Sequence, residues 1–126
     1  MKTLKLDLDG KNGLTNFLNR IWIIKYLGLR VEKCQVHHTT NGFHVRLVCE
    51  NEVDDVKGVL MQTLLGSDYR RELCNLLKVE RGSKKFNLLF KEKWDFDKLG
   101  RQYSLSKEKY DRELSEKVLK VIHRGE

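Results

Sequence analysis

An α+β fold is predicted by two periodicities in this chain of 126 residues. Four segments alternate apolar and polar side chains with a period of two, which is typical of half-buried strands. Between and after them, apolar residues recur at the 3.6-residue period of amphipathic helices. The length is that of one ordinary domain, so one continuous core is expected.

The first strand is predicted over residues 3–9, where leucines stand at every second position. Residues 10–13 form the turn, because glycines stand at both of its ends. An amphipathic helix follows over residues 14–27. Gly28 then occupies the position of a C-cap glycine, which marks the end of this helix.

A β-hairpin is predicted from residues 31–38 and 43–49, two strand-like segments that flank Asn41-Gly42. Both loop residues tolerate positive φ, as a two-residue type I′ turn requires. This loop fixes the register and places His37 opposite Arg46. A slip of one residue would turn the apolar side chains away from the core.

The remaining chain is predicted to be helix, strand and helix. A helical region runs from about residue 51 to residue 79 and is interrupted near Ser67, a candidate N-cap. The fourth strand is expected over residues 85–94. After a linker, the last helix covers residues 107–123, with a linker serine as its cap.

This order of elements predicts a ferredoxin-like, or RRM-like, βαββαβ domain over residues 1–100. Right-handed crossovers place both helical regions on one sheet face and leave the other face open. Residues 101–126 form a C-terminal helical extension of the same domain. Its helix can cover the open face, pack beside the other helices, or pair with another chain.

Polar side chains of all four strands should share the open face, because side chains alternate across a strand. They are Lys5, Asp7 and Asp9, then Lys33, Gln35 and His37, then His44 and Arg46, and finally Asn87, Lys91 and Lys93. Two carboxylates on one strand suit Mg²⁺ or Mn²⁺, and a nearby histidine and arginine suit a phosphate. The alternative is a set of solvated ion pairs.

The charge of the chain favours a polyanionic partner. The formal net charge is +7 and the isoelectric point about 9.4. Basic side chains that neutralise phosphates release counterions, which drives binding to DNA or RNA. The side chains expected to contact nucleic acid are Lys33, Gln35, His37, Arg46, Lys91 and Lys93. Phe43 points into the core in this register, so base stacking on it is not expected.

The pair of motifs Asp7-Leu8-Asp9 and Thr39-Thr40-Asn41-Gly42-Phe43-His44 resembles the archaeo-eukaryotic primase superfamily. The likeness covers about residues 4–48. It implies an RRM-like core, metal ligation by Asp7 and Asp9, and contact of His44 with nucleotide phosphates, which makes these three residues the candidate catalytic residues. It also suggests a small replication-associated protein of an archaeal virus or plasmid, and the abundance of Lys, Arg and Glu hints at a thermophilic source.

The chain departs from that family in its third acidic residue, which the family carries on a later strand. The predicted fourth strand has no acid on the open face, and Asp68 lies in the helical region. No residue is therefore a clear substitute. A relative that binds nucleic acid without catalysis is an equally good reading.

Three function classes remain open. The first is a nucleic-acid-binding protein, and the second is a metal-dependent nucleotidyl-transferase or nuclease of primase type. The third is an assembly protein that forms a homodimer or larger oligomer through its C-terminal helix or a sheet edge.

His37-His38 with Tyr110 also invites comparison with HUH replication initiators, but adjacent strand residues point to opposite faces and cannot chelate one ion together.

Three cysteines and the N-terminus bear on the cellular setting. The odd count and the absence of a CxxC pair argue against a zinc site or a secreted disulfide framework. The predicted register places Cys34 opposite Cys49, either as a disulfide or, more in line with a reducing cytosol, as two buried thiols.

No apolar run approaches the roughly 20 residues of a membrane span. Carboxylates near the N-terminus argue against a signal peptide, so a cytoplasmic protein is expected, in the host cytoplasm if viral.

Overall fold

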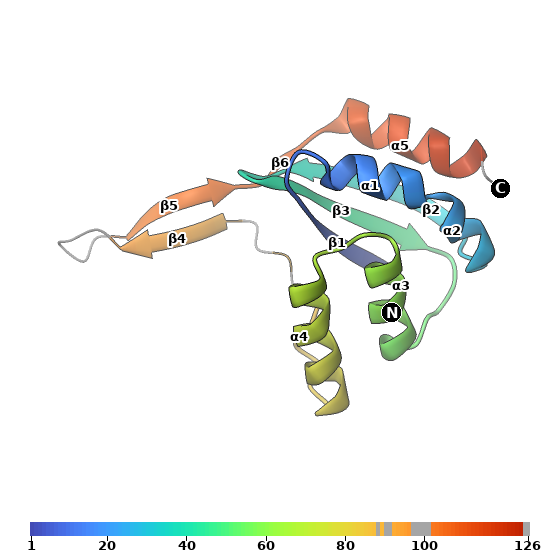
Figure 1. Ribbon diagram of the computed structural model, residues 1–126, viewed down its shortest axis with the longest axis horizontal. Helices are drawn as coiled ribbons and strands as arrows, with labels where there is room; N and C mark the ends of the chain where they lie inside the picture. Colours follow the sequence, from blue (N-terminus) through green and yellow to red (C-terminus); the bar gives the residue numbers. More distant parts are fainter. Residues whose placement is uncertain (88, 90–91, 97–101, 125–126) are drawn as a thin grey trace.

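The computed structural model describes residues 1–87, 89, 92–96 and 102–124 and shows an α+β fold (Figure 1). A four-stranded antiparallel sheet has the order β1-β3-β2-β6, and β4 and β5 form a separate two-stranded hairpin. The strands are β1 (Thr3–Asp9), β2 (Val31–His38), β3 (Gly42–Cys49), β4 (Glu92–Phe96), β5 (Gln102–Lys107) and β6 (Lys109–Tyr110). The helices are α1 (Gly13–Arg20), α2 (Trp22–Tyr26), α3 (Asp55–Leu64), α4 (Tyr69–Glu80) and α5 (Arg112–Arg124). Within the described part of the chain, no helix is long and apolar enough to cross a membrane.

The prediction of an α+β class with an antiparallel sheet is confirmed, but the predicted fourth strand is wrong. β3 lies between β1 and β2 and runs antiparallel to both, as the split βαβ arrangement requires. Residues 85–87 and 89 belong to no strand, and 92–96 pair only with β5 in a hairpin that projects away from the sheet (Figure 1). The fourth strand of the sheet is β6, which pairs with β2 at the opposite edge.

The core lies between the sheet and the layer of α1, α2 and α5 (Figure 1). Leucines of β1, valines of β2 and β3, and the apolar faces of these helices fill it. Its buried side chains include Leu4, Leu6, Leu8, Phe17, Ile24, Val36, Val45, Leu47, Val118 and Ile122. Because these side chains occupy one face, polar residues of the same strands point to the opposite face, for which we keep the name open face.

The C-terminal helix α5 packs in the protein's own core. Val118 and Ile122 are buried, and the Ser115 hydroxyl accepts a hydrogen bond from the Val36 N–H at 2.8 Å. The helix begins later than predicted, and its cap is Asp111, whose carboxylate accepts from the Leu114 N–H at 2.9 Å. The linker serines expected to cap it lie in β5 instead. The apolar stripe that suggested pairing with another chain is therefore used within this one.

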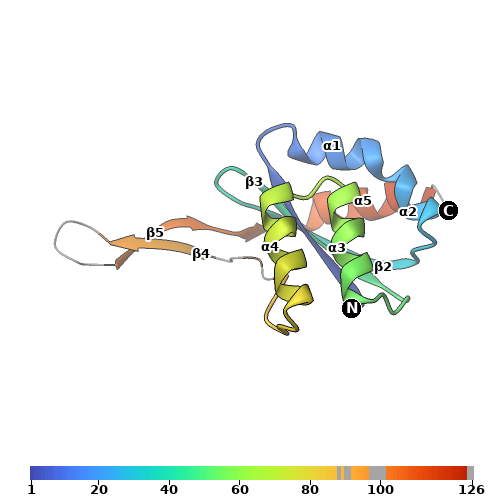
Figure 2. The same cartoon turned by 60° about the horizontal axis from the view of Figure 1, so that its bottom comes forward.

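The outer edge of β1 is covered by α3 and α4 (Figure 2), at the place where a ferredoxin-like fold would add its fourth strand. The Lys5 N–H donates to the Gln62 side chain at 2.9 Å, and the Asp7 N–H donates to the Ser67 hydroxyl at 3.0 Å. The Asp68 N–H in turn donates to the Asp7 carbonyl at 2.7 Å. These bonds satisfy backbone groups that an edge strand otherwise leaves open.

The hairpin of β2 and β3 is present, but its predicted register is wrong by two residues. His37 lies opposite His44, and the Thr39 N–H donates to the Gly42 carbonyl at 2.9 Å, so the two-residue loop is Thr40-Asn41. A shift of two residues leaves each side chain on its predicted face, because the period is also two. Gly42 is needed for another reason: a Cβ there would collide with the backbone of β1.

The cysteines are free, as the preferred alternative expected. Cys34 lies opposite Leu47 rather than Cys49, and both thiols are buried. Burial raises the pKa of Cys34 to about 12. Burial, aided by the negative charge of Glu32, raises that of Cys49 to about 11. Both therefore behave as small apolar side chains at neutral pH.

Candidate metal and phosphate site on the open face

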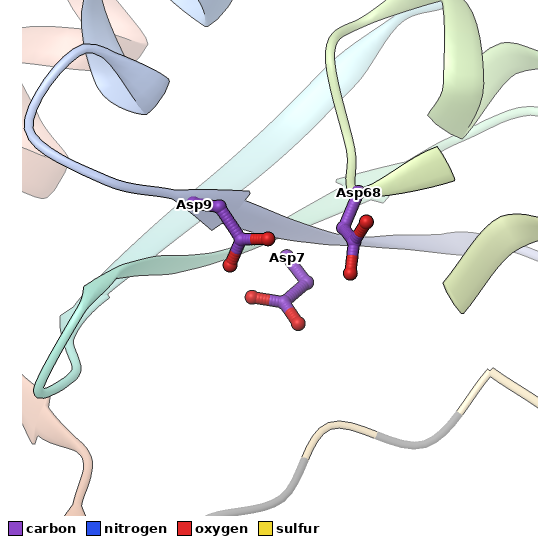
Figure 3. Close-up of side chains that lie close together, drawn as sticks. All are labelled: Asp7, Asp9 and Asp68. Atoms are coloured by element: carbon purple, nitrogen blue, oxygen red, sulfur yellow. The ribbon is translucent and has the colours of Figure 1, made fainter. Parts of the chain in front are cut away.

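Three carboxylates gather at one end of β1. Asp7 and Asp9 come from the strand, and Asp68 comes from the start of α4 (Figure 3). One oxygen of each lies within 4.8 Å of an oxygen of the others. Asp9 is exposed, and Asp7 and Asp68 are partly buried, so the cluster remains in contact with solvent.

Asp68 reaches this cluster because the turn between α3 and α4 is fastened to β1. The hydroxyl of Ser67 accepts from the Asp7 N–H, and the next residue, Asp68, donates its N–H to the Asp7 carbonyl. Ser67 is therefore not the N-cap that was predicted. Asp68 caps α4 instead, by accepting from the Arg70 N–H at 3.1 Å.

The donor set fits Mg²⁺ or Mn²⁺. Both ions prefer carboxylate oxygens, and with bonds of about 2.1 Å the ligands of an octahedral Mg²⁺ lie about 3.0 Å apart when adjacent and about 4.2 Å apart when opposite. The three oxygens lie within 4.8 Å of one another, so the carboxylates would have to move closer together to share one ion. Without a cation, each pair of charges at this spacing repels by about 1 kcal/mol in water and about 3 kcal/mol at a protein-surface dielectric.

Basic side chains stand next to the carboxylates. Arg71 donates from Nη1 to the Lys5 carbonyl at 2.8 Å. Burial and the nearby charges of Arg46 and Arg71 lower the pKa of Lys5. Burial also lowers the pKa of Arg71, although the charges of Glu72 and Asp7 oppose this shift. The open face thus combines an acidic cluster with three cations, an arrangement that suits a phosphate group and its counterion.

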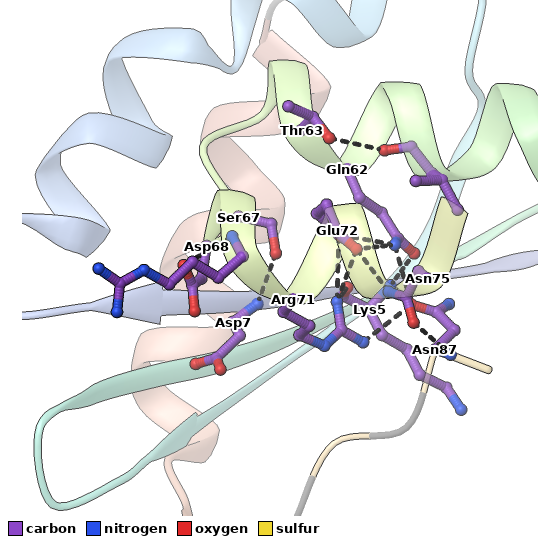
Figure 4. Close-up of polar contacts among 12 residues, drawn as sticks. Lys5, Asp7, Gln62, Thr63, Ser67, Asp68, Arg71, Glu72, Asn75 and Asn87 are labelled. Carbon is purple, nitrogen blue, oxygen red and sulfur yellow. Dashed lines mark hydrogen bonds and ion pairs between the residues drawn. The ribbon is translucent and has the colours of Figure 1, made fainter. Parts of the chain in front are cut away.

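A buried polar network holds Arg71 in place (Figure 4). Glu72 accepts hydrogen bonds from Gln62, at 2.8 Å and 2.9 Å, and from Asn75, at 2.6 Å. Asn87 accepts from Arg71 at 2.8 Å and is buried, with a positive φ of 62°. It was expected on the open face of a fourth strand, but it belongs to this network instead. Burial raises the pKa of Glu72, although Arg71 and the amides of the network lower it in part.

A second cluster of ionisable side chains centres on the carboxylate of Glu108, between β5 and β6. Its Oε2 lies 2.8 Å from His44 Nδ1, and its Oε1 lies 3.2 Å from Arg46 Nη2 and 3.7 Å from His37 Nε2. The other ring nitrogen of His44, Nε2, lies 3.6 Å from an oxygen of Asp7. His44 therefore connects Glu108 with the acidic cluster.

Known proteins offer no guide to this arrangement. No protein-family model, curated protein or solved structure matches the chain. The function of the site therefore has to be inferred from its own geometry and chemistry.

The structure brings together only some of the residues expected to bind nucleic acid. Gln35 lies opposite Arg46 on β2, and Lys33 is exposed two residues earlier on the same strand. Lys91 lies outside the described residues. Lys93 belongs to β4 in the projecting hairpin, so it does not flank the open face as predicted.

Three residues of the open face were not predicted to belong there: Asp68, Glu108 and Tyr110. Tyr110 lies opposite His37 on β6, the two rings are 5.1 Å apart, and the tyrosine is 52% exposed. It was expected within the last helix, predicted over residues 107–123. Glu108 and Asp68 reach the site only through contacts between distant parts of the chain, for which a single sequence carries no local signal.

Proposed function

We propose that this protein binds nucleic acid on its open face and transfers nucleotidyl groups there with the help of a divalent cation. The observation that carries this proposal is the third carboxylate. With Asp7 and Asp9 alone, binding without chemistry was an equally good reading. Asp68 completes a set of three carboxylate oxygen donors, which lies next to the cationic side chains of Lys5, Arg46 and Arg71.

The acidic and the basic side chains of the site would have different roles. Asp7, Asp9 and Asp68 would hold Mg²⁺ or Mn²⁺, which supplies Lewis-acid stabilisation of the charge on the transferred phosphoryl group. Lys5, Arg46 and Arg71 attract the phosphate oxygens. His44 lies at the border between the two groups, where its Nε2 is 3.6 Å from Asp7 Oδ1. Donors that are fixed before the reaction stabilise developing charge more effectively than mobile ones.

The resemblance to archaeo-eukaryotic primases supports the same chemistry. Its two motifs lie on adjacent antiparallel strands, and Asp7 stands directly opposite His44. The departure is the source of the third acid, which comes from a helix N-cap rather than a strand. A primase-type polymerisation on a nucleic-acid template is therefore the form of the reaction that we propose, and replication is its biological context.

Nucleic acid would follow the exposed part of the open face. The net charge of +7 supplies the general attraction. Tyr110 offers an exposed ring for stacking on a base, a contact worth about 1–3 kcal/mol in single-strand-binding proteins. Lys33 and Gln35 extend the same face along β2.

The test is an extension assay with a labelled primer annealed to a template, nucleoside triphosphates, and Mg²⁺ or Mn²⁺. Longer products support nucleotidyl transfer, and shorter products indicate the nuclease alternative. Asp68→Asn should abolish either activity. Asp55→Asn is the matched control, because Asp55 is exposed in the first turn of α3. Full activity of Asp68→Asn would contradict the proposal.

A second candidate function, binding without chemistry, is favoured by the charge of the chain alone. It predicts affinity for single-stranded DNA or RNA that falls steeply with salt, and no change of the nucleic acid. The assembly function has less support, because Val118 and Ile122 of α5 are buried in the protein's own core. A mass measurement in solution that gave a stable dimer would revive it.

A further inference from the structure

We infer that Glu108 is a positioning residue that sets the tautomer and the orientation of the His44 ring beside the acidic cluster. The part of this inference that concerns activity rests on the proposed function. The part that concerns the orientation of the imidazole does not. Glu108 itself touches neither the acidic cluster nor, in this reading, the substrate.

Both carboxylate oxygens of Glu108 have a partner. Oε2 lies 2.8 Å from His44 Nδ1, and Oε1 lies 3.2 Å from Arg46 Nη2. Its side chain is only 7% exposed. A buried carboxylate without partners would be costly, so these contacts hold the side chain in one place.

Glu108 is ionised in this setting. Burial raises its pKa, but hydrogen bonds from His44 and Arg46 and the positive charges nearby lower it more, so that the pKa lies below its ordinary value. An ionised carboxylate can only accept hydrogen bonds. Nδ1 of His44 must therefore carry a proton, which faces Glu108.

This assignment fixes the role of the other ring nitrogen. Nε2 lies 3.6 Å from Asp7 Oδ1 and points toward the acidic cluster. When a carboxylate holds one ring nitrogen of a histidine, the direction of the other ring nitrogen is fixed, as in many metal sites. Glu108 therefore selects both the tautomer and the direction of His44.

The inference can be tested without any activity, by ¹⁵N-resolved NMR of the His44 ring at a pH at which the imidazole is neutral. The wild-type protein should show the proton on Nδ1. Glu108→Ala should shift the ring toward the Nε2 tautomer, whereas Glu113→Ala should leave it unchanged, because Glu113 is exposed on α5. An Nε2 proton in the wild type, or an unchanged ring in Glu108→Ala, would overturn the inference.

Steady-state extension kinetics test the catalytic part. Glu108→Ala should lower kcat by about 10- to 100-fold with a smaller change in KM, the usual loss when the partner of an active-site histidine is removed. In a His44→Ala background the same change should cost less than about twofold, because residues that act through one another are not additive. Glu108→Gln, which keeps an acceptor oxygen, should recover part of the rate.

Equal losses from Glu108→Ala in both backgrounds would mean that Glu108 does not act through His44, and the inference would fail. Wild-type protein without any extension activity would remove the proposed function instead. The NMR result would still decide whether Glu108 orients His44.

Discussion

The Asp68 N–H donates a 2.7 Å hydrogen bond to the Asp7 carbonyl, so the helix cap of α4 and the strand β1 meet at the acidic cluster. The same backbone bond both closes the edge of β1 and sets the distance between the two carboxylates. Formation of the site is therefore tied to formation of the fold.

Removal of one carboxylate should remove metal binding without harm to the fold. Mn²⁺ should raise the melting temperature of the wild-type protein, because a ligand that binds only the folded state stabilises it. Asp68→Asn should abolish this increase, whereas Asp55→Asn should retain it. In the absence of metal, Asp68→Asn should be at least as stable as the wild type, since it relieves repulsion within the cluster. Differential scanning calorimetry with and without Mn²⁺ measures both effects.

Loss of the Ser67 hydroxyl should weaken the attachment of the α3–α4 turn. Ser67→Ala leaves the partly buried Asp7 N–H without its partner, so a loss near the lower end of the roughly 1–3 kcal/mol for a fully buried donor is expected. Urea denaturation should show this loss. Ser83→Ala serves as the control, because Ser83 accepts from the Lys85 N–H at an exposed loop, and it should change the free energy of unfolding by less than about 0.5 kcal/mol.

Glu108 should make the protein sensitive to acid. Its folded-state pKa lies below the ordinary value of 4.5, so its stabilising contribution is complete above that pH and is lost as the pH falls through the folded-state pKa. The wild type should therefore exceed Glu108→Gln in stability at neutral pH, and the difference should shrink only below about pH 4.5. Urea midpoints from pH 7 down to acid give the curve. A difference that did not depend on pH would exclude this linkage.

Tyr110 should contribute to affinity for single-stranded nucleic acid. Tyr110→Ala should weaken binding by about 1–3 kcal/mol if the ring stacks on a base. Tyr26→Ala is the matched control, because Tyr26 is an exposed aromatic residue on α2, on the helical side of the sheet. Fluorescence anisotropy with a labelled oligonucleotide at two salt concentrations compares them, and equal losses from both variants would argue against a defined path along the open face.

The three thiols should differ sharply in reactivity. Cys34 and Cys49 have raised pKa values and are buried, whereas Cys74 is exposed on α4. Since the thiolate is the reactive form, a thiol reagent at mildly alkaline pH should label one cysteine quickly and the other two only after denaturation. Rapid labelling of Cys34 would show that the core opens more readily than this packing implies.

The first three strands and the assignment of their faces could be predicted from the sequence, because alternation has a period of two. Even the wrong hairpin loop shifted the register by two residues and so left His44 and Arg46 on the predicted side. The coarse positions of the helices followed from apolar spacing in the same way. Both signals are local, and local periodicity survives in the folded protein.

The fourth strand and most of the site could not be predicted, since they depend on contacts between distant segments. Alternation around Phe86 and Asn87 is typical of a strand. Asn87 instead donates its N–H to Asn75 and accepts from Gln62 and Arg71, and these bonds hold it in a left-handed conformation. Asp68 was visible as an acid in a helical region, but only the bond to β1 places it beside Asp7. Nothing near Glu108 in the sequence indicates His44 as its partner.

The covered edge of β1 also limits how the protein can aggregate. A strand from another molecule that docked along this edge would have to displace Gln62, Ser67 and Asp68 from the backbone groups of Lys5 and Asp7. Sheet-to-sheet aggregation at this edge would thus dismantle the carboxylate cluster. Growth into fibres through β1 and function at the site are mutually exclusive states of the same surface.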